Sequence, residues 1–171
     1  MPPLFKSIFV PLYFKINMPD LKEGDLAPAI SARDQNGELI TLEEYRGNKV
    51  VLFFYPKDNT PGCTAEACGL RDNYSRFLEQ GYEIVGISAD SEKSHQNFIA
   101  KHQLPFRLIS DPERKVIQDY GAWGEKKLYG KTYMGILRKT YVINQDGYVE
   151  KIIEKVLTKE HSEQIFSDLS H

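Results

Sequence analysis

Hydrophobic and polar positions alternate along this chain between short apolar runs and stretches with helical spacing. The clearest apolar run is KVVLFFY at residues 49–55, which is rich in β-branched and aromatic residues. Such a run is typical of a central strand covered on both faces. After it, from Pro61 onward, apolar residues recur at helical spacing, and Gly81 supplies a stop before a second strand-like run, YEIVGIS at 82–88. The pattern predicts a βαβ unit.

The alternation continues towards the C-terminus. We expect helices over 92–102, 114–120 and 159–169, and strands over 106–110, 138–144 and 148–154. The last two strands flank Asp146-Gly147, a tight-turn dipeptide, and should pair antiparallel. The glycine-spotted stretch at 121–136 is interpreted as an irregular loop.

The segment AISARDQNGELITL at 29–42 holds two short strand-like runs around Asn36-Gly37, a dipeptide suited to a tight hairpin. We interpret it as an edge hairpin. Combined with the β/α alternation, it predicts an α/β fold with a mixed central β-sheet flanked by helices and an N-terminal hairpin. The thioredoxin-like architecture is the best candidate.

Composition narrows the function classes. A chain of 171 residues suits one domain, which buries roughly two thirds of its unfolded surface. The formal net charge of -2 and the 41% of hydrophobic residues describe an ordinary soluble protein. Without a basic excess, neither nucleic acid nor an anionic membrane is an expected partner.

The opening segment, MPPLFKSIFVPLYFKIN, is apolar and weakly basic. Pro11 interrupts it, its apolar run is too short to span a bilayer, and no small-residue cleavage site follows. A signal peptide stays an alternative. We expect residues 1–17 to be a disordered or loosely docked extension and residues 18–171 to form the single domain of a cytoplasmic protein.

The candidate chemistry concentrates in FFYPKDNTPGCTAEACGL at 53–70, which holds the only two cysteines, Cys63 and Cys68. Two cysteines are too few for a disulfide scaffold, so their proximity indicates redox chemistry or no role. A closed zinc site needs about four Cys or His ligands, and the histidines show no compact spacing with this pair. We expect no metal and interpret all four histidines as exposed: His95, His102, His161 and His171.

Thr60 and Pro61 suit the start of a helix. At the N-cap, the Thr60 hydroxyl can accept a hydrogen bond from a backbone N–H of the first turn. Pro61 has no N–H to donate, but an N–H at the first helical position would have no acceptor within the helix, so proline costs nothing there. Cys63 then falls in the first turn, where free N–H groups and the helix dipole stabilise a thiolate. A buried cysteine that acts as a small hydrophobe is the alternative.

Cys68 follows Cys63 by five positions. Five residues of α-helix separate the two Cα atoms by roughly 8.7 Å, whereas disulfides rarely bridge more than about 7 Å. If these cysteines pair, the first turns must unwind, so the reduced helix and the disulfide are alternative states. The other interpretation is that Cys68 packs where alanine would serve.

Four segments resemble the peroxiredoxins, specifically the bacterioferritin comigratory protein or peroxiredoxin Q subgroup: FFYPKDNTPGCTAEAC, GISADS, SDPERKVIQDYG and GEKKLYGKTYMGILRKTYVIN. The resemblance runs from about residue 18 to the C-terminal helix. The family motif Pro-x-x-x-Thr-x-x-Cys is present as Pro56, Thr60 and Cys63, and the local second cysteine of the subgroup as Cys68. The active-site arginine of the family corresponds to Arg138.

This resemblance implies a thiol-dependent peroxidase that reduces hydrogen peroxide and organic hydroperoxides in antioxidant defence. Cys63 would become a sulfenic acid, and Cys68 would resolve it as an intramolecular disulfide. The resemblance also implies thioredoxin or a glutaredoxin-like reductant, no metal or organic cofactor, and a monomer.

Thiolate attack on a peroxide needs an ionised sulfur, donors for the oxygens and stabilisation of the leaving oxygen. We expect Thr60 and the backbone near Gly62 and Cys63 to hold the peroxide, and Arg138 to supply positive charge. Pro56 would shield the thiolate from water. Outside this motif, an arginine such as Arg138 is ordinarily a surface charge.

Three further residues are weaker candidates. Glu66 either orients Arg138, as the resemblance suggests, or is an ordinary first-turn carboxylate that favours the helix dipole. Tyr55 and Trp123 either line the pocket or pack in the core.

Two rival functions remain open. A thioredoxin-type thiol-disulfide oxidoreductase normally uses Cys-x-x-Cys, and the spacing here is wider. A redox sensor or chaperone-like binding protein would report peroxide through the same unwinding. Repeated turnover with a reductase system distinguishes a peroxidase from a sensor.

Overall fold

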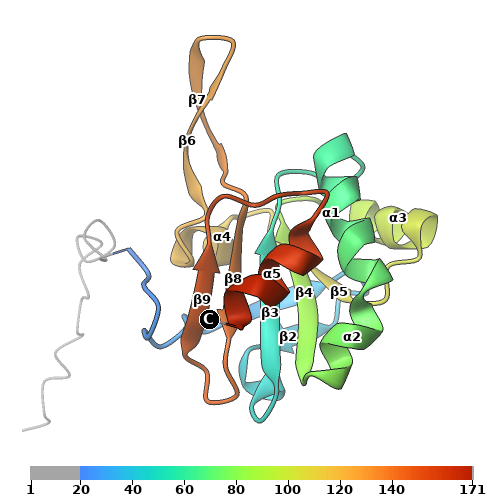
Figure 1. Ribbon diagram of the computed structural model, residues 1–171. Helices are drawn as coiled ribbons and strands as arrows, with labels where there is room; N and C mark the ends of the chain where they lie inside the picture. The colour runs from blue at the N-terminus through green and yellow to red at the C-terminus, as the bar shows by residue number, and fades with distance from the viewer. Residues whose placement is uncertain (1–19, 171) are drawn as a thin grey trace, which may run out of the picture.

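The computed structural model describes residues 20–170, so the expected extension at 1–17 lies outside the described residues. Figure 1 shows one twisted sheet with helices on both faces and a separate hairpin that projects away from the body. The strands are β1 (Ser31–Asp34), β2 (Leu39–Thr41), β3 (Lys49–Phe54), β4 (Tyr82–Ser88), β5 (Arg107–Ser110), β6 (Trp123–Leu128), β7 (Lys131–Ile136), β8 (Lys139–Ile143) and β9 (Val149–Ile153). The helices are the short 3₁₀ helix η2 (Glu43–Tyr45), α1 (Pro61–Asp72), α2 (Tyr74–Glu79), α3 (Glu92–His102), α4 (Lys115–Asp119) and α5 (His161–Leu169).

The seven-stranded sheet has the order β2-β1-β5-β4-β3-β8-β9. At its centre β3 pairs in parallel with β4 and antiparallel with β8, as its continuous apolar run predicts. Residues of β3 alternate between two cores. Val50, Leu52 and Phe54 face α4, whereas Val51 and Phe53 face α1, α2, α3 and α5. The predicted mixed sheet flanked by helices is confirmed.

Both predicted hairpins of the main sheet are present. β1 and β2 pair antiparallel around Asn36-Gly37, with β2 at the sheet edge. β8 and β9 pair antiparallel across the turn that contains Gly147. Gly37 and Gly147 have φ of +74° and +89°, in the left-handed region that the turns require.

The helical pattern after Pro61 forms two helices rather than one. The side chain of Asn73 donates to the Gly69 carbonyl at 3.0 Å, while the Asn73 backbone N–H turns to Leu70 at 3.2 Å. The amide side chain has replaced the backbone N–H that would continue the helix. α1 therefore ends at Asp72, and α2 starts at Tyr74.

The irregular loop expected at 121–136 was a wrong interpretation, because these residues contain the antiparallel hairpin of β6 and β7. Tyr129 and Gly130 both have positive φ, +50° and +75°, which is the signature of a two-residue type I′ turn. Gly130, at the second position of this turn, therefore marks a hairpin and not an irregular loop. Figure 1 shows the hairpin standing clear of the main sheet.

The expectation of exposed histidines was also wrong for His95 and His161, which are both buried. His95 precedes Phe98 by three positions on the inner face of α3, and His161 precedes Ile165 by four on α5. His102 is partly buried, and His171 lies outside the described residues. Among residues 20–170, none of the helices has the length and apolar character needed to cross a bilayer.

Candidate active site

The loop from residue 55 to 60 carries the chain from the end of β3 into α1. Thr60 occupies the N-cap position with extended backbone angles, as predicted. Its hydroxyl, however, donates to the Lys57 carbonyl at 2.8 Å instead of accepting from the helix, so the predicted capping bond was wrong. The hydroxyl proton is thereby directed into the loop, and the Thr60 oxygen keeps lone pairs that can accept.

Cys63 lies in the first turn of α1, and its side chain is almost fully buried, with 1% exposed. Thr64 is the first residue whose N–H donates within the helix, to Thr60 at 2.8 Å. Helix geometry therefore leaves the N–H groups of Gly62 and Cys63 without intrahelical acceptors. These donors and the positive end of the helix dipole favour negative charge beside the sulfur.

Arg138 reaches Cys63 from the start of β8. Its Nη2 donates to the Cys63 sulfur at 3.2 Å, and its Nη1 donates to Glu66 Oε2 at 2.5 Å. The sheet explains this approach, because Phe54 at the end of β3 pairs with Lys139, the residue after Arg138. The structure thus brings together three residues that the sequence singled out, with Glu66 ion-paired to Arg138.

Glu66 is fully buried on α1. Burial raises the pKa of its carboxyl to about 7, although the Arg138 guanidinium acts in the opposite direction. Among residues 20–170 its Oε1 has no hydrogen-bond partner and lies 3.6 Å from His161 Nε2. The group is therefore poised between its ionised and neutral forms near neutral pH.

His161 and Thr140 belong to the same cluster, and neither was predicted from the sequence as a site residue. His161 Nδ1 lies 3.0 Å from Gln164 Oε1, and its Nε2 lies 2.7 Å from the Thr140 hydroxyl. Burial lowers the pKa of His161 to about 4, so the ring is neutral at pH 7. Since an amide oxygen only accepts, Nδ1 carries the proton and Nε2 accepts from Thr140. The spacing of His161 to Ile165 was the available signal.

An open pocket of about 540 Å³ lies against Arg138. Its walls are Pro56, Leu137, Arg138 and Val156, with lysines and Glu154 around them. Arg138 is about three quarters buried, with 22% of its side chain exposed, so it separates the sulfur from the open pocket. Arg138 and Pro56 thus lie where a small substrate would approach Cys63.

Tyr55 and Trp123, the weaker candidates, lie outside this lining. Tyr55 is fully buried, and its hydroxyl donates to Asp58 Oδ1 at 2.6 Å. Trp123 begins β6 and packs beneath the Arg114 guanidinium, 4.2 Å from its ring centre. Neither side chain is placed to touch a molecule bound at Arg138.

Cys68 is a free, partly exposed thiol in the same continuous helix as Cys63. Helix geometry separates their Cα atoms by roughly 8.7 Å, which is beyond disulfide reach. The structure is therefore the reduced, helical state of the two alternatives.

Within residues 20–170, one group of potential metal ligands is formed by Asp58, Asp90 and His95. The His95 Nδ1 to Asp58 Oδ2 distance is only 2.7 Å. Nitrogen and oxygen ligands of a tetrahedral zinc ion lie about 3.3 Å apart, because each bond is about 2.0–2.1 Å long. The short contact fits a shared proton and does not fit a tetrahedral zinc ion.

Three comparisons, two of sequence and one of structure, relate this chain to known proteins. The AhpC/TSA family matches residues 24–152. Peroxiredoxin Bcp of Escherichia coli is 41% identical over 150 residues, covering 88% of this chain and 96% of its own. Peroxiredoxin Bcp of Bacillus subtilis is 44% identical over 138 residues, covering 81% and 88%.

Solved structures give the same picture. Peroxiredoxin Q of Xanthomonas campestris superposes with a TM-score of 0.79 at 33% identity, covering 88% of this chain and 95% of its own. A PrxQ mutant from Xylella fastidiosa gives a TM-score of 0.82 at 28% identity, covering 90% and 98%. With these neighbours the predicted thioredoxin-like fold is confirmed.

Proposed function

The chain belongs to the AhpC/TSA family and is a thiol peroxidase acting on peroxides, and from that premise we propose that Cys63 is its peroxidatic cysteine and Cys68 its resolving cysteine. The observation that carries the assignment is the contact of Arg138 with the Cys63 sulfur at 3.2 Å, in the first turn of α1. Among the described cysteines, Cys63 alone has this combination of a cationic donor and a helix N-terminus.

In the first step the Cys63 thiolate attacks the terminal oxygen of the hydroperoxide. A sulfur–oxygen bond forms as the oxygen–oxygen bond breaks; the sulfur is oxidised to sulfenic acid, and the leaving alkoxide or hydroxide takes a proton. Arg138 and the N–H groups of Gly62 and Cys63 stabilise the developing negative charge. The Thr60 oxygen accepts from the peroxide O–H, and Pro56 excludes water.

In the second step the Cys68 thiol attacks the sulfenic sulfur of Cys63. A disulfide forms and water leaves, so the sulfenic acid is consumed before a second peroxide can oxidise it to sulfinic acid. Because α1 is helical through both cysteines, its first turns must unwind before the two sulfurs meet.

A dithiol reductant then restores both thiols by exchange through a mixed disulfide. We assign this role to thioredoxin or a glutaredoxin-like protein. Both cysteines lie on one chain, so the cycle runs in a monomer, and residues 18–171 act as one domain in the cytoplasm. Organic hydroperoxides belong to the substrate class, as the alkyl peroxide reduction activity of the Xanthomonas campestris bacterioferritin comigratory protein supports.

The first test is mass spectrometry of the reduced protein after one equivalent of hydrogen peroxide, beside the variant Cys63→Ser. We expect the wild type to lose two hydrogens and yield a peptide that links Cys63 to Cys68, and the variant to yield neither. Absence of rapid oxidation at Cys63 would contradict the assignment and favour a binding or sensor role.

The resolving role needs a separate variant. Cys68→Ser should leave the first oxidation of Cys63 intact, slow recycling and increase sulfinic acid, because the sulfenic acid loses its intramolecular partner. Peroxide consumption over many turnovers, with a thioredoxin system, measures recycling. Unchanged turnover and unchanged oxidation products would mean that another thiol resolves Cys63.

A further inference from the structure

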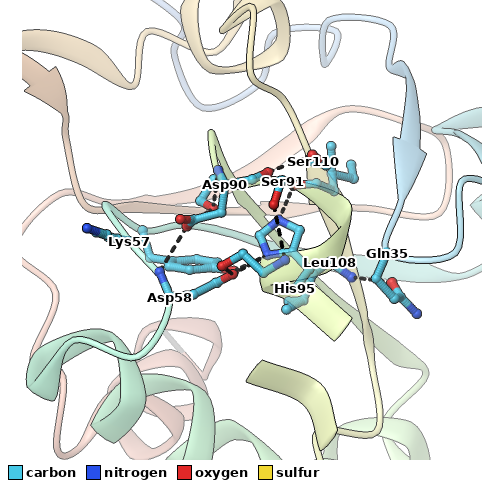
Figure 2. A network of polar contacts seen from close by, with 12 residues as sticks. Gln35, Lys57, Asp58, Asp90, Ser91, His95, Leu108 and Ser110 are labelled. Atoms are coloured by element: carbon cyan, nitrogen blue, oxygen red, sulfur yellow. Dashed lines mark hydrogen bonds and ion pairs between the residues drawn. The ribbon is translucent and has the colours of Figure 1, made fainter. Parts of the chain in front are cut away.

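The loop that carries Thr60 into α1, residues 55–60 and here called the peroxidatic loop, is tied to α3 through the buried side chain of Asp58. Tyr55 donates to Asp58 Oδ1 at 2.6 Å, and Ser94 donates to Oδ2 at 2.8 Å. His95 Nδ1 lies 2.7 Å from the same Oδ2. Figure 2 shows Asp58 and His95 pointing toward one another, with Asp90 beside them. Both oxygens of this carboxylate are therefore engaged.

The hydrogen-bond partners fix the protons of this pair. His95 Nε2 lies 3.0 Å from the carbonyl oxygen of Ile109, which can only accept, so Nε2 carries a proton. The short contact between Nδ1 and Asp58 Oδ2 requires a second proton. Tyr55 and Ser94 also donate to Asp58, so the carboxyl group accepts two hydroxyl hydrogen bonds in addition to the proton that it shares with Nδ1. The contact is a fully buried, proton-sharing pair.

The backbone of the loop is held as well. The N–H of Asp58 donates to Asp90 Oδ2 at 2.9 Å, and Ser88 donates to the same oxygen at 2.7 Å. The next residue, Asn59, is exposed and has a φ of +61°, in the left-handed region. The hydrogen bonds that tie the loop to α3 and to Asp90 therefore end at Asp58, directly before the residues that lead into α1.

A second attachment lies beyond Cys68. The carbonyl of Gly69 accepts from the Asn73 side chain at 3.0 Å and from Ser162 of α5 at 2.9 Å. Residues 59–68 thus lie between two side-chain attachments, and both Cys63 and Cys68 fall within that segment. It is the segment that must unwind if the two sulfurs are to meet.

We propose that the buried Asp58–His95 pair is a positioning element of the peroxidase cycle. It holds the peroxidatic loop in the geometry needed for peroxide attack, and it sets the N-terminal limit of the segment that unwinds for disulfide formation. This inference rests on the proposed roles of Cys63 and Cys68.

The two chemical steps need opposite states of that segment. Peroxide attack needs the folded first turn, where Cys63 contacts Arg138. Condensation with Cys68 needs the unwound turn. Weakening the attachment at Asp58 shifts the population towards the unwound state. The rate of the first step should therefore fall while the rate of the second rises, a combination that general destabilisation does not produce.

The test uses the full chain with Asp58→Ala, Asp58→Asn and, as a matched control, Asp34→Ala. Asp34 is also buried and is ion-paired to Arg107 at 2.9 Å, but among the described residues its side chain bonds only Asn36, Glu38 and Arg107, none of them in residues 55–60 or α3. Rapid-quench thiol trapping with mass spectrometry gives the rates of Cys63 oxidation by hydrogen peroxide and of disulfide formation. For Asp58→Ala we expect about a tenfold slower oxidation and several-fold faster disulfide formation.

Asp58→Asn should stay within about twofold of the wild type in both rates, since each original contact keeps a donor and an acceptor. The new amide nitrogen can donate to Nδ1 of a neutral His95, whose Nε2 proton still goes to Ile109. Asp34→Ala should lower stability without separating the two rates. If Asp58→Ala does not fold, Ser94→Ala replaces it in the test, because it removes one donor to Asp58. It should also slow Cys63 oxidation and speed disulfide formation, each by a smaller factor.

Three results would overturn the inference: both rates unchanged in the Asp58→Ala or Ser94→Ala variant, both rates lowered together, or Asp58→Asn shifted as far as Asp58→Ala. The failure of the proposed function looks different. In that case the wild-type protein itself would form no Cys63–Cys68 disulfide in the same assay.

Discussion

Two clusters, each built around a buried carboxyl group, adjoin the N-terminal half of α1. In the anchoring cluster, Asp58 meets His95, and both carboxylate oxygens receive donors. In the reactive cluster, Glu66 meets Arg138, but within residues 20–170 its Oε1 has no donor, and Arg138 lines an open pocket. The carboxyl group of the first cluster is enclosed and fully hydrogen-bonded. The second cluster borders an open pocket, and one of its carboxyl oxygens has no hydrogen-bond partner among the described residues.

This difference suits the first cluster to holding the loop in one conformation and the second to taking part in the reaction. A fully satisfied buried network fixes one arrangement of its groups, because each unmade hydrogen bond there costs free energy. A partly satisfied cluster leaves a carboxyl whose pKa is raised by burial to about 7, beside the arginine that touches the sulfur. Perturbed groups of this kind gather at reacting sites. The comparison leads to three predictions, on the cation, the carboxyl and the far attachment.

The largest effect is expected from Arg138→Met, which removes the cation of the reactive cluster. The rate constant for Cys63 oxidation by hydrogen peroxide should fall by roughly 10²- to 10³-fold, since a charged donor to the transition state is lost. Arg76→Met is the control, because Arg76 is also ion-paired, to Glu163 at 2.7 Å, but lies on α2 outside the pocket. Competition for hydrogen peroxide against a reporter peroxidase measures both. Equal rates in the two variants would remove Arg138 from the reaction.

The second prediction concerns the pH dependence of stability in Glu66→Gln. The pKa of Glu66 is about 7 in the folded protein, above the ordinary value of 4.5, so the folded state binds more protons between these values. Stability from Glu66 is thus complete below pH 4.5 and is lost as the pH rises through 7. The amide that replaces the carboxyl does not titrate. The free energy of unfolding of the variant, relative to that of the wild type, should therefore rise by on the order of 3 kcal/mol between pH 4.5 and 7.

His161 makes the wild-type profile flatter than Glu66 alone would. Its pKa is lowered from 6.5 to about 4, so its contribution is present above pH 6.5 and is lost as the pH falls through 4. The two slopes oppose each other over the shared window. Urea unfolding of the reduced proteins at several pH values measures the difference, with Glu154→Gln as an exposed control. A pH-independent difference between Glu66→Gln and the wild type would show that Glu66 is ionised throughout.

The sequence predicted the local part of this arrangement. The apolar run of β3 marked the sheet centre, Thr60-Pro61 marked the start of α1, and the family motif selected Cys63. The contact of Arg138 with Cys63 was reached only through the resemblance. It depends on the antiparallel register of β8 against β3, and local spacing does not encode that register.

The partners of the anchoring cluster escaped prediction for a related reason. Asp58 precedes Asn59-Thr60 in a loop, where aspartate is an ordinary turn residue. Its partner His95 lies 37 positions later on another helix. The sequence analysis took His95 as exposed. Its helical spacing to Phe98 was the available signal that it faces inward, but an inward histidine has no predictable partner until the helices are packed.

The smallest effect is expected at the far attachment of the unwinding segment, through Ser162→Ala. Ser162 donates to the Gly69 carbonyl at 2.9 Å, and Asn73 still donates there after the change. Loss of one such bond costs about 1 kcal/mol, so disulfide formation should accelerate by up to about fivefold with little change in peroxide attack. The control is Ser170→Ala, whose hydroxyl donates within residues 20–170 to the α5 carbonyls of Phe166 and Ser167. Rapid-quench trapping measures both steps. An unchanged rate of disulfide formation, together with a lowered Tm, would mean that the unwinding ends before Gly69 and that α5 takes no part in limiting it.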